Sequence, residues 1–285
     1  PLRGTAIMTT GFDPRRFKAM ERAGFNRIAG RYADSAHLRV ELAEALLAAA
    51  AVAPGERVLD LASGPCLLAA DAAHRTQPGG LVLATDIAES MLAEGARRCG
   101  PRNGLLFAAA DAEHLCLADG CMDAVLAGLA LFMFPHPERA LVEMHRVLVP
   151  GGRLVLSVWS ERERVPLIAR AQDCIARLLP SPKVARPSVF RFGTPAVLEE
   201  SLRSAGFDEI TLAPCRFSCR FADAEAYWQA FLDLAGGAAE ALGRLPEATG
   251  AALRAAVEHD LEVHRDPEGG FTVPAEALVA VARRR

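Results

Sequence analysis

The sequence predicts an α/β fold with a doubly wound, mostly parallel sheet of seven strands and a helical cap over the carboxyl ends of the strands. Three observations predict it. Short apolar runs alternate with helical patterns through the first half of the chain, at the spacing of right-handed βαβ units. The run Val58–Leu61 passes into the small residues Ala62–Gly64 and then into a helix, which is the ligand-binding corner of such sheets. The 285 residues are 51% hydrophobic, which is enough for a sizeable core.

The first half of the chain contains five predicted parallel strands and three helices that cross between them. The strands are expected at 57–61, 81–85, 105–108, 123–127 and 152–159, and the helices at 66–75, 88–98 and 137–147. Before the first strand, residues 13–51 carry two apolar stripes at helical spacing. Because this segment precedes the sheet, we expect it to pack over the ligand crevice as a lid.

The second half is less regular, and one of its elements stays ambiguous. The expected elements are a helix and an irregular loop over 160–193, a helix over 195–205 capped by Thr194 and ended by Gly206, a strand over 208–213 with an extension to Phe221 left open, and helices over 223–234 and 247–262. Residues 278–281 fit an antiparallel seventh strand and a terminal helix nearly equally. We therefore divide the chain into an N-terminal helical lid (1–52), a ligand-binding core (53–160), and cap insertions with the closing strands (161–285).

A carboxylate stands near the end of the first strand, beside the expected ligand. A dinucleotide would place an anionic pyrophosphate over this turn and prefers the pattern G-x-G-x-x-G, but Asp60 would repel that anion. S-adenosylmethionine (SAM) carries an ammonium and a sulfonium and no phosphate. Asp60 therefore favours SAM over NAD, with the small residues Ala62, Ser63 and Gly64 allowing the close approach of the ligand. The alternative is that Asp60 only caps the helix that follows.

A second carboxylate, Asp86, ends the second strand. It lies in the region about 20 residues after the glycine turn, where such sheets bind the ribose hydroxyls. A carboxylate can accept both hydroxyls, and it would repel a 2′-phosphate. Met91 follows one helical turn later, where its thioether could pack on an adenine face. Asp86 could also cap the helix 88–98, and the two roles can coexist.

Four segments, in this order and at this spacing, resemble the motifs of class I SAM-dependent methyltransferases, and they look most like the ubiquinone/menaquinone C-methylase-like branch. They are Val58–Gly64, Ala84–Leu92, Ala110–Leu115 and Arg146–Leu154. The resemblance is strong over about residues 20–160 and weak elsewhere. It implies a Rossmann-like core and an enzyme that transfers a methyl group from SAM, with S-adenosylhomocysteine as the product.

The resemblance also implies individual cofactor contacts. In the family, an acid after the third strand receives the adenine amino group and the next backbone N–H contacts the ring, and backbone carbonyls beyond the fourth strand take the methionine ammonium. Residues 25–32 resemble the family's lid, in which a Tyr often approaches the cofactor. The cofactor-binding residues expected from the residues and the resemblance together are Tyr32, Asp60, Ala62, Ser63, Gly64, Asp86, Ile87, Met91, Asp111, Ala112 and Leu129.

Two residues depart from the family's glycine pattern. Ala62 replaces the first glycine and Cys66 replaces the third, which normally lets the helix and the strand pack closely. Because Cys is small and apolar, we expect the corner to persist and the thiol to be buried and inert.

The expected chemistry is in-line methyl transfer to a small acceptor, for which alignment and exclusion of water matter most. It requires no metal and no covalent nucleophile. The candidate bases are Tyr32, His37 and His136, each of which has a surface or capping role as its alternative. An aromatic pocket wall is expected from Phe25, Phe132, Phe134, Trp159 and Trp228, together with Tyr32, and it favours a planar or prenyl-like acceptor. The motifs do not distinguish O-, N-, C- and S-transfer.

Composition excludes some partners and leaves one alternative function. A net charge of −3 gives no electrostatic footprint for nucleic acid. The longest apolar run, 124–135, is too short to span a bilayer. Seven dispersed Cys without a visible secretory signal predict free thiols in a reducing cytoplasm. The alternative to an enzyme is a SAM-binding regulator or scaffold without catalysis, and the sequence leaves the oligomeric state open.

Overall fold

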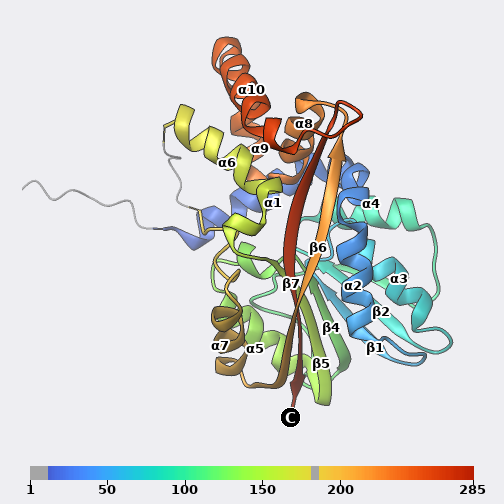
Figure 1. Ribbon diagram of the computed structural model, residues 1–285. Helices are drawn as coiled ribbons and strands as arrows, with labels where there is room; N and C mark the ends of the chain where they lie inside the picture. Colours follow the sequence, from blue (N-terminus) through green and yellow to red (C-terminus); the bar gives the residue numbers. More distant parts are fainter. Residues whose placement is uncertain (1–11, 181–185) are drawn as a thin grey trace, which may run out of the picture.

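One mixed sheet organises the computed structural model, which describes residues 12–180 and 186–285 (Figure 1). Within these residues the strand order is β3-β2-β1-β4-β5-β7-β6. β1 to β5 run parallel, β7 is antiparallel to β5, and β6 is antiparallel to β7. The strands are β1 (Arg57–Leu61), β2 (Leu81–Asp86), β3 (Leu105–Ala109), β4 (Met122–Gly128), β5 (Leu148–Trp159), β6 (Phe207–Phe221) and β7 (Phe271–Arg284).

Helices cover both faces of the sheet, as the doubly wound pattern predicts (Figure 1). The helices are α1 (Pro14–Asp34), η1 (Ser35–Arg39), α2 (Val40–Ala50), α3 (Leu67–Arg75), α4 (Glu89–Cys99), η2 (Leu131–Met133), α5 (Pro137–Val147), η3 (Arg162–Arg164), α6 (Pro166–Leu178), α7 (Pro195–Ser204), α8 (Ala224–Leu234), α9 (Gly237–Gly243), α10 (Glu247–Leu261) and η4 (Glu262–His264). Of these, α2, α3 and α4 lie on one face and α5 and α7 on the other. The predicted fold class is therefore confirmed.

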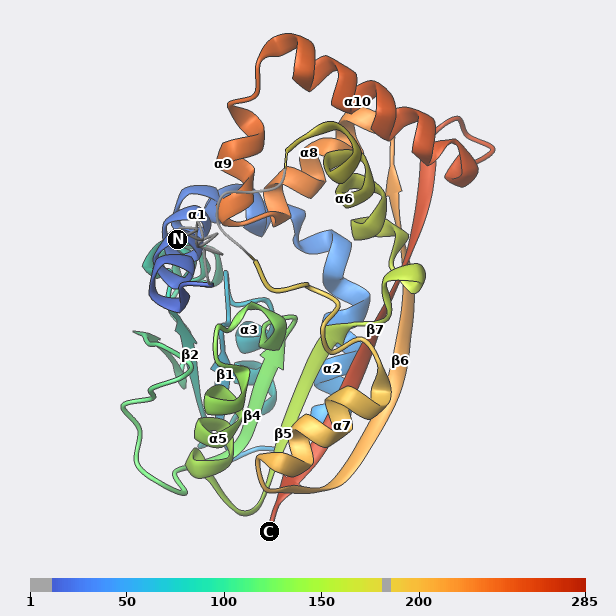
Figure 2. The same cartoon turned by 90° about the vertical axis from the view of Figure 1, so that its left-hand side faces the viewer.

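A cap stands beyond the carboxyl ends of the parallel strands (Figure 2). It comes from two separate insertions, α6 after β5 and α8 to α10 between β6 and β7, and α1 packs against α8 and α9. β6 and β7 run on past β5 into this cap, so the sheet itself carries the inserted helices. α1 meets α9 at Gly24, where a Cβ would overlap the backbone of Gly237.

The segment 13–51 differs from the expected lid. A 3-10 turn at Ser35–Arg39 breaks the helical pattern into α1, which reaches the cap, and α2, which does not. α2 packs against β4, β5 and β7 and buries Leu42 and Leu46 in the main core. It therefore covers a face of the sheet, because its apolar stripe is satisfied by the strands beneath it.

Two further predictions at the C-terminal side are corrected or decided by the structure. Residues 271–284 are a strand, which pairs with both β5 and β6 and settles the ambiguity over 278–281. Its alternating pattern is weak in the sequence because both faces of the strand are buried. Thr194 precedes α7, but its hydroxyl donates to Glu161 at 3.4 Å and does not cap the helix. α9 has no counterpart among the predicted elements.

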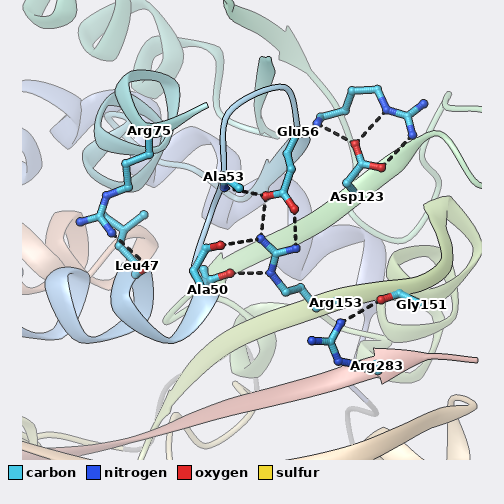
Figure 3. A network of polar contacts seen from close by, with 11 residues as sticks. Leu47, Ala50, Ala53, Glu56, Arg75, Asp123, Gly151, Arg153 and Arg283 are labelled. Atoms are coloured by element: carbon cyan, nitrogen blue, oxygen red, sulfur yellow. Dashed lines mark hydrogen bonds and ion pairs between the residues drawn. The ribbon is translucent and has the colours of Figure 1, made fainter. Parts of the chain in front are cut away.

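A network of polar contacts fixes the amino ends of the strands, opposite the cap (Figure 3). Arg153 on β5 donates to the carbonyl oxygens of Ala50 and Ala51, at the carboxyl end of α2, and to the carboxylate of Glu56. The Arg153 guanidinium holds the pKa of Glu56 below its ordinary value. This contact caps α2 from outside the helix and ties it to β5.

Candidate functional site

The turn after β1 retains a glycine-type backbone although two of its glycines are replaced. Ala62, Gly64 and Cys66 have φ values of 53°, 54° and 64°, in the left-handed region. A non-glycine residue costs about 1–2 kcal/mol there, so the turn stores strain of the kind found at functional sites. The Cys66 side chain fits because Gly95 on α4 faces it, and a Cβ at Gly95 would overlap Sγ. Burial raises the pKa of the Cys66 thiol to about 12, which keeps it protonated near neutral pH.

A cavity opens over this turn, between α1, α2 and the carboxyl ends of β1, β4 and β5. Its apolar wall comes from α2 and α3, and its polar groups are few. The predicted residues that line it are Tyr32, Asp60, Ala62, Ser63, Gly64 and Leu129. The cavity also contains Arg39, which sequence reasoning missed.

Asp60 is buried at the floor of the cavity with half of its carboxylate unused. Only 1% of the residue is exposed. Its Oδ2 accepts a hydrogen bond from the Ser63 hydroxyl at 2.7 Å, while Oδ1 has no hydrogen-bond partner. Burial raises the pKa of Asp60 to about 7, against the opposing effect of the Ser63 hydrogen bond. The backbone N–H of Ala69, in the first turn of α3, also opposes the rise in the pKa of Asp60, so the predicted role of Asp60 at the start of that helix stays open.

Arg39 and Tyr32 form the opposite side of the cavity. The Arg39 guanidinium lies over the Tyr32 ring, 4.1 Å from its centroid, and donates to the Tyr32 carbonyl and the Ser35 hydroxyl. Arg39 is only 8% exposed. Tyr32 reaches across to Gly64, where a Cβ would lie 3.6 Å from the Tyr32 ring. No local signal in the sequence marks Arg39, because it lies at the end of a 3-10 turn, outside the α-helix that carries Tyr32.

Asp86 connects the end of β2 to the glycine turn. Its Oδ2 accepts the Gly64 N–H at 2.9 Å and its Oδ1 accepts the Ala88 N–H at 2.8 Å. Burial raises the pKa of Asp86, and these two N–H groups oppose the rise. Asp86 and Ile87 are half-buried and lie outside the cavity lining. Asp86 thus fixes the turn, and its remaining lone pairs can accept further donors.

Leu129, directly after β4, is held in an unusual conformation. Its φ is 50°, and its N–H donates to both the carbonyl and the hydroxyl oxygen of Ser157 on β5. A left-handed leucine persists only where its surroundings impose that conformation. Ser157 provides this constraint, and both residues line the cavity.

The remaining residues predicted to contact the nucleoside differ in their exposure to solvent. Asp111 follows β3 with 30% of its side chain exposed and pairs with Lys18 of α1 at 2.7 Å. Ala112 beside it is buried. Met91 is not available to an adenine face, because α1 covers it with Ile28 and Ala29 in a separate apolar cluster.

The predicted aromatic wall is not assembled around the cavity, where Tyr32 is its one member. Large rings at the other positions complete hydrophobic clusters elsewhere, since their burial stabilises the fold. Phe25 meets the Tyr32 ring edge-on, Phe132 and Phe134 pack against the main core, Trp159 packs near Phe217, and Trp228 stacks on Phe231.

Neither candidate histidine lines the cavity. His37 is exposed, and its Nδ1 lies 3.1 Å from the Asp34 carbonyl oxygen. His136 precedes α5 and donates its backbone N–H to Glu113, while its Nδ1 lies 3.3 Å from Glu138. Both rings therefore have local partners, and the structure does not bring either to Asp60 or Tyr32.

Comparison with known proteins agrees with this geometry. Residues 59–156 match the methyltransferase domain family. The chain is 35% identical over 181 residues to a demethylmenaquinone methyltransferase of Clavibacter sepedonicus, an alignment that spans 61% of this chain and 70% of the relative. It is 34% identical over 169 residues to the ubiquinone/menaquinone biosynthesis C-methyltransferase UbiE of Methylobacterium nodulans, spanning 54% of this chain and 67% of the relative.

The fold is also found among solved structures. The YcgJ protein of Bacillus subtilis superposes with a TM-score of 0.55 at 17% identity, covering 88% of this chain and 98% of that one. Among the described residues, no helix combines the length and the apolar character that crossing a membrane requires. From its sequence relatives, its domain match and its strand order, the chain belongs to the class I SAM-dependent methyltransferases, in the ubiquinone/menaquinone C-methylase-like branch, and SAM is its cofactor.

Proposed function

We propose that the cavity holds the methionine part of SAM between Asp60 and Arg39. The observation that carries this proposal is the unpartnered Oδ1 of a fully buried carboxylate facing the same cavity as a buried guanidinium. A buried carboxylate oxygen without a hydrogen-bond partner is costly, and an ammonium supplies the missing donor. The guanidinium suits the α-carboxylate of the same amino acid. Asp60 and Arg39 together thus match a zwitterion.

The nucleoside part would extend from the glycine turn toward β3. Asp86 accepts the ribose hydroxyls through its free lone pairs, next to the turn that it already holds through Gly64. Asp111 accepts the adenine amino group, and the backbone N–H of Ala112 together with the side chain of Ile87 borders the ring. These assignments rest on the family resemblance and on the positions of three strand ends at one edge of the sheet.

When bound, SAM supplies a methyl group that is already activated by the sulfonium. The chain's own contribution is to orient the cofactor and the acceptor and to enclose the methyl group that is transferred. Tyr32 covers the glycine turn from α1, and Ser157 fixes Leu129 at the end of β4. Both enclose the reacting centre and exclude water, which is the main requirement of in-line transfer. Of the three candidate bases only Tyr32 is placed at this cavity.

The acceptor we propose is a small aromatic ring of the quinol type, with or without a prenyl tail, methylated at carbon. The support is the printed activity of the relatives, a demethylmenaquinone methyltransferase and a C-methyltransferase of ubiquinone/menaquinone biosynthesis. A cytoplasmic location stays a prediction.

The test has two stages. Titration calorimetry with S-adenosylhomocysteine measures cofactor binding, and Arg39→Met is expected to weaken it about tenfold or more, the loss of a charged hydrogen bond. Methyl transfer is then measured by mass spectrometry with reduced naphthoquinols that carry or lack a short prenyl chain. A gain of one methylene unit on ring carbon supports the proposal. Tight nucleoside binding with no transfer to either quinol would favour a silent SAM-binding protein.

A further inference from the structure

One lysine connects the N-terminal helix to the segment after β3. Residues 12–180 and 186–285 contain a single lysine, Lys18 of α1. Its Nζ donates to Oδ2 of Asp111 at 2.7 Å and to Oε2 of Glu113 at 2.8 Å. One ammonium therefore bridges two carboxylates that lie 93 and 95 residues away in the chain.

The two carboxylates have different surroundings. The Glu113 side chain is only 2% exposed, and its other oxygen accepts the backbone N–H of His136 at 2.9 Å. It is a buried anchor, with Lys18 as its counter-ion. The Asp111 side chain keeps 30% of its surface exposed, although both oxygens are already held, Oδ2 by Lys18 and Oδ1 by the Glu113 N–H at 3.0 Å. Asp111 is thus fixed in direction and still open to a further donor.

This fixed carboxylate lies beside the proposed ribose site. β2 and β3 pair in register up to Asp86 and Ala109, and the Ala110 N–H donates to the Asp86 carbonyl at 3.0 Å. Asp111 is the next residue, so the two acids stand at adjacent strand ends. α1 lies over this end of the sheet (Figure 2). A sugar on Asp86 would place its base toward Asp111.

We propose that Lys18 is a positioning residue that holds Asp111 as the acceptor for a 6-amino purine and so sets the selectivity of the cofactor site for adenine over a 6-oxo purine. This inference rests on the proposed nucleoside site. An ionised carboxylate accepts the exocyclic N–H of adenine, whereas the 6-oxo group offers only an acceptor and faces it unpaired. Discrimination of this kind requires a carboxylate of fixed direction and charge, and Lys18 supplies both.

The structure contains a matched control on the same helix. Arg22, one turn after Lys18, pairs with Glu89 of α4 and also docks α1 on the core, but it does not touch Asp111. A change at Arg22 perturbs the docking of α1 alone. A change at Lys18 perturbs the docking and, on this proposal, the direction of Asp111.

The experiment compares the dissociation constants of S-adenosylhomocysteine and its deaminated analogue S-inosylhomocysteine, measured by calorimetry. The wild-type protein is expected to prefer the adenosyl compound, and Lys18→Met to reduce this preference at least about tenfold, the effect of a lost hydrogen bond to a charged group. Lys18→Arg is expected to restore most of the preference. Arg22→Met should change the two constants by the same factor. In an Asp111→Asn background, Lys18→Met should reduce the preference no further.

The outcomes separate the possible failures. Equal weakening of both ligands by Lys18→Met would show that the lysine only docks α1, and would overturn the inference while leaving the cofactor site intact. Binding of neither ligand by the wild-type protein would reject the proposed nucleoside site and this inference with it. If Lys18→Met fails to fold, as near-ultraviolet circular dichroism would show, Lys18→Gln retains amide N–H donors without the charge. An unchanged preference in Lys18→Gln would equally overturn the role.

Discussion

The substitution Asp60→Asn should increase the stability of the cofactor-free protein. It should also weaken the binding of the cofactor. The pKa of Asp60 is raised from its ordinary value of 3.8 to about 7, chiefly by burial. Between these values the unfolded chain has lost the proton while the folded chain keeps it. Stability therefore falls as the pH rises through this window, and the loss is complete above about pH 7.

The size of the effect follows from the two pKa values. One pKa unit corresponds to about 1.4 kcal/mol, so the rise from 3.8 to about 7 costs ~4 kcal/mol of unfolding free energy at pH 8. Asparagine carries no charge and can still accept from Ser63, but its amide N–H in the same place would lack a partner at a cost of about 1–3 kcal/mol. We expect a net gain of ~1–3 kcal/mol at pH 8, which shrinks as the pH falls toward 4.

Urea unfolding from pH 4 to pH 8 measures this difference directly. Asp71→Asn is the matched control. It makes the same chemical change on α3, but the Asp71 side chain is exposed to solvent. The control should follow the pH dependence of the wild type. Parallel curves for the wild type and Asp60→Asn would show that Asp60 is ionised at no such cost, and the reasoning from its burial would be wrong.

Cofactor binding should release a proton from the carboxyl group of Asp60. An ammonium beside Asp60 favours its ionised form, so cofactor binding near pH 7 should release about half a proton, and close to one at pH 6. Calorimetry in two buffers with different ionisation enthalpies counts this proton. Asp60→Asn should release none and bind more weakly. A binding enthalpy of the wild type that is independent of the buffer would remove Asp60 from the ammonium site.

Three further predictions concern the ribose site, the turn after β1 and the polar network at the amino ends of the strands. Asp86→Ala should weaken S-adenosylhomocysteine by ~1.5–3 kcal/mol through loss of a charged hydrogen bond to the ribose; unchanged calorimetry would contradict that role. Cys66→Gly should keep cofactor affinity within severalfold, because glycine favours the φ of 64° at this position, and complete loss of binding would show that the turn is misunderstood. Arg153→Met should lower the unfolding free energy by about 2–3 kcal/mol in urea, since Glu56 and the carbonyls at the end of α2 lose their donor. The same change should leave cofactor affinity unaltered, and it should abolish the part of the acid sensitivity that comes from the lowered pKa of Glu56, a stabilisation present above its ordinary pKa and lost as the pH falls.

The sequence was sufficient for the elements whose signals are local. β1 matches its predicted bounds, and β2 and β3 exceed theirs by one residue, because apolar runs bounded by turn residues mark buried parallel strands. The acids at 60, 86 and 111 were found for the same reason. Each lies within two residues of the end of such a strand, and all parallel strands finish at one edge of the sheet.

Packing between distant segments decided which basic residues contact the predicted site residues and where the aromatic rings lie. Arg39 contacts Tyr32 and Lys18 contacts Asp111, and no local pattern distinguishes these two basic residues from the others of the same helices. Most of the predicted aromatic wall does not line this cavity, for the converse reason. Large rings look alike in a sequence whether they fill a core or line a pocket, and Trp228 fills the cap.

The sequence by itself thus determined the class of the fold, the family and the acids at the ends of the strands, since these depend on periodicity and on the residue at the end of each strand. Only the tertiary structure decided that α2 covers the sheet, that Gly95 makes room for Cys66 and that Asp60 keeps one oxygen free. Those outcomes depend on which surfaces meet and on how much water is excluded between them, and neither is encoded in any short stretch of the chain.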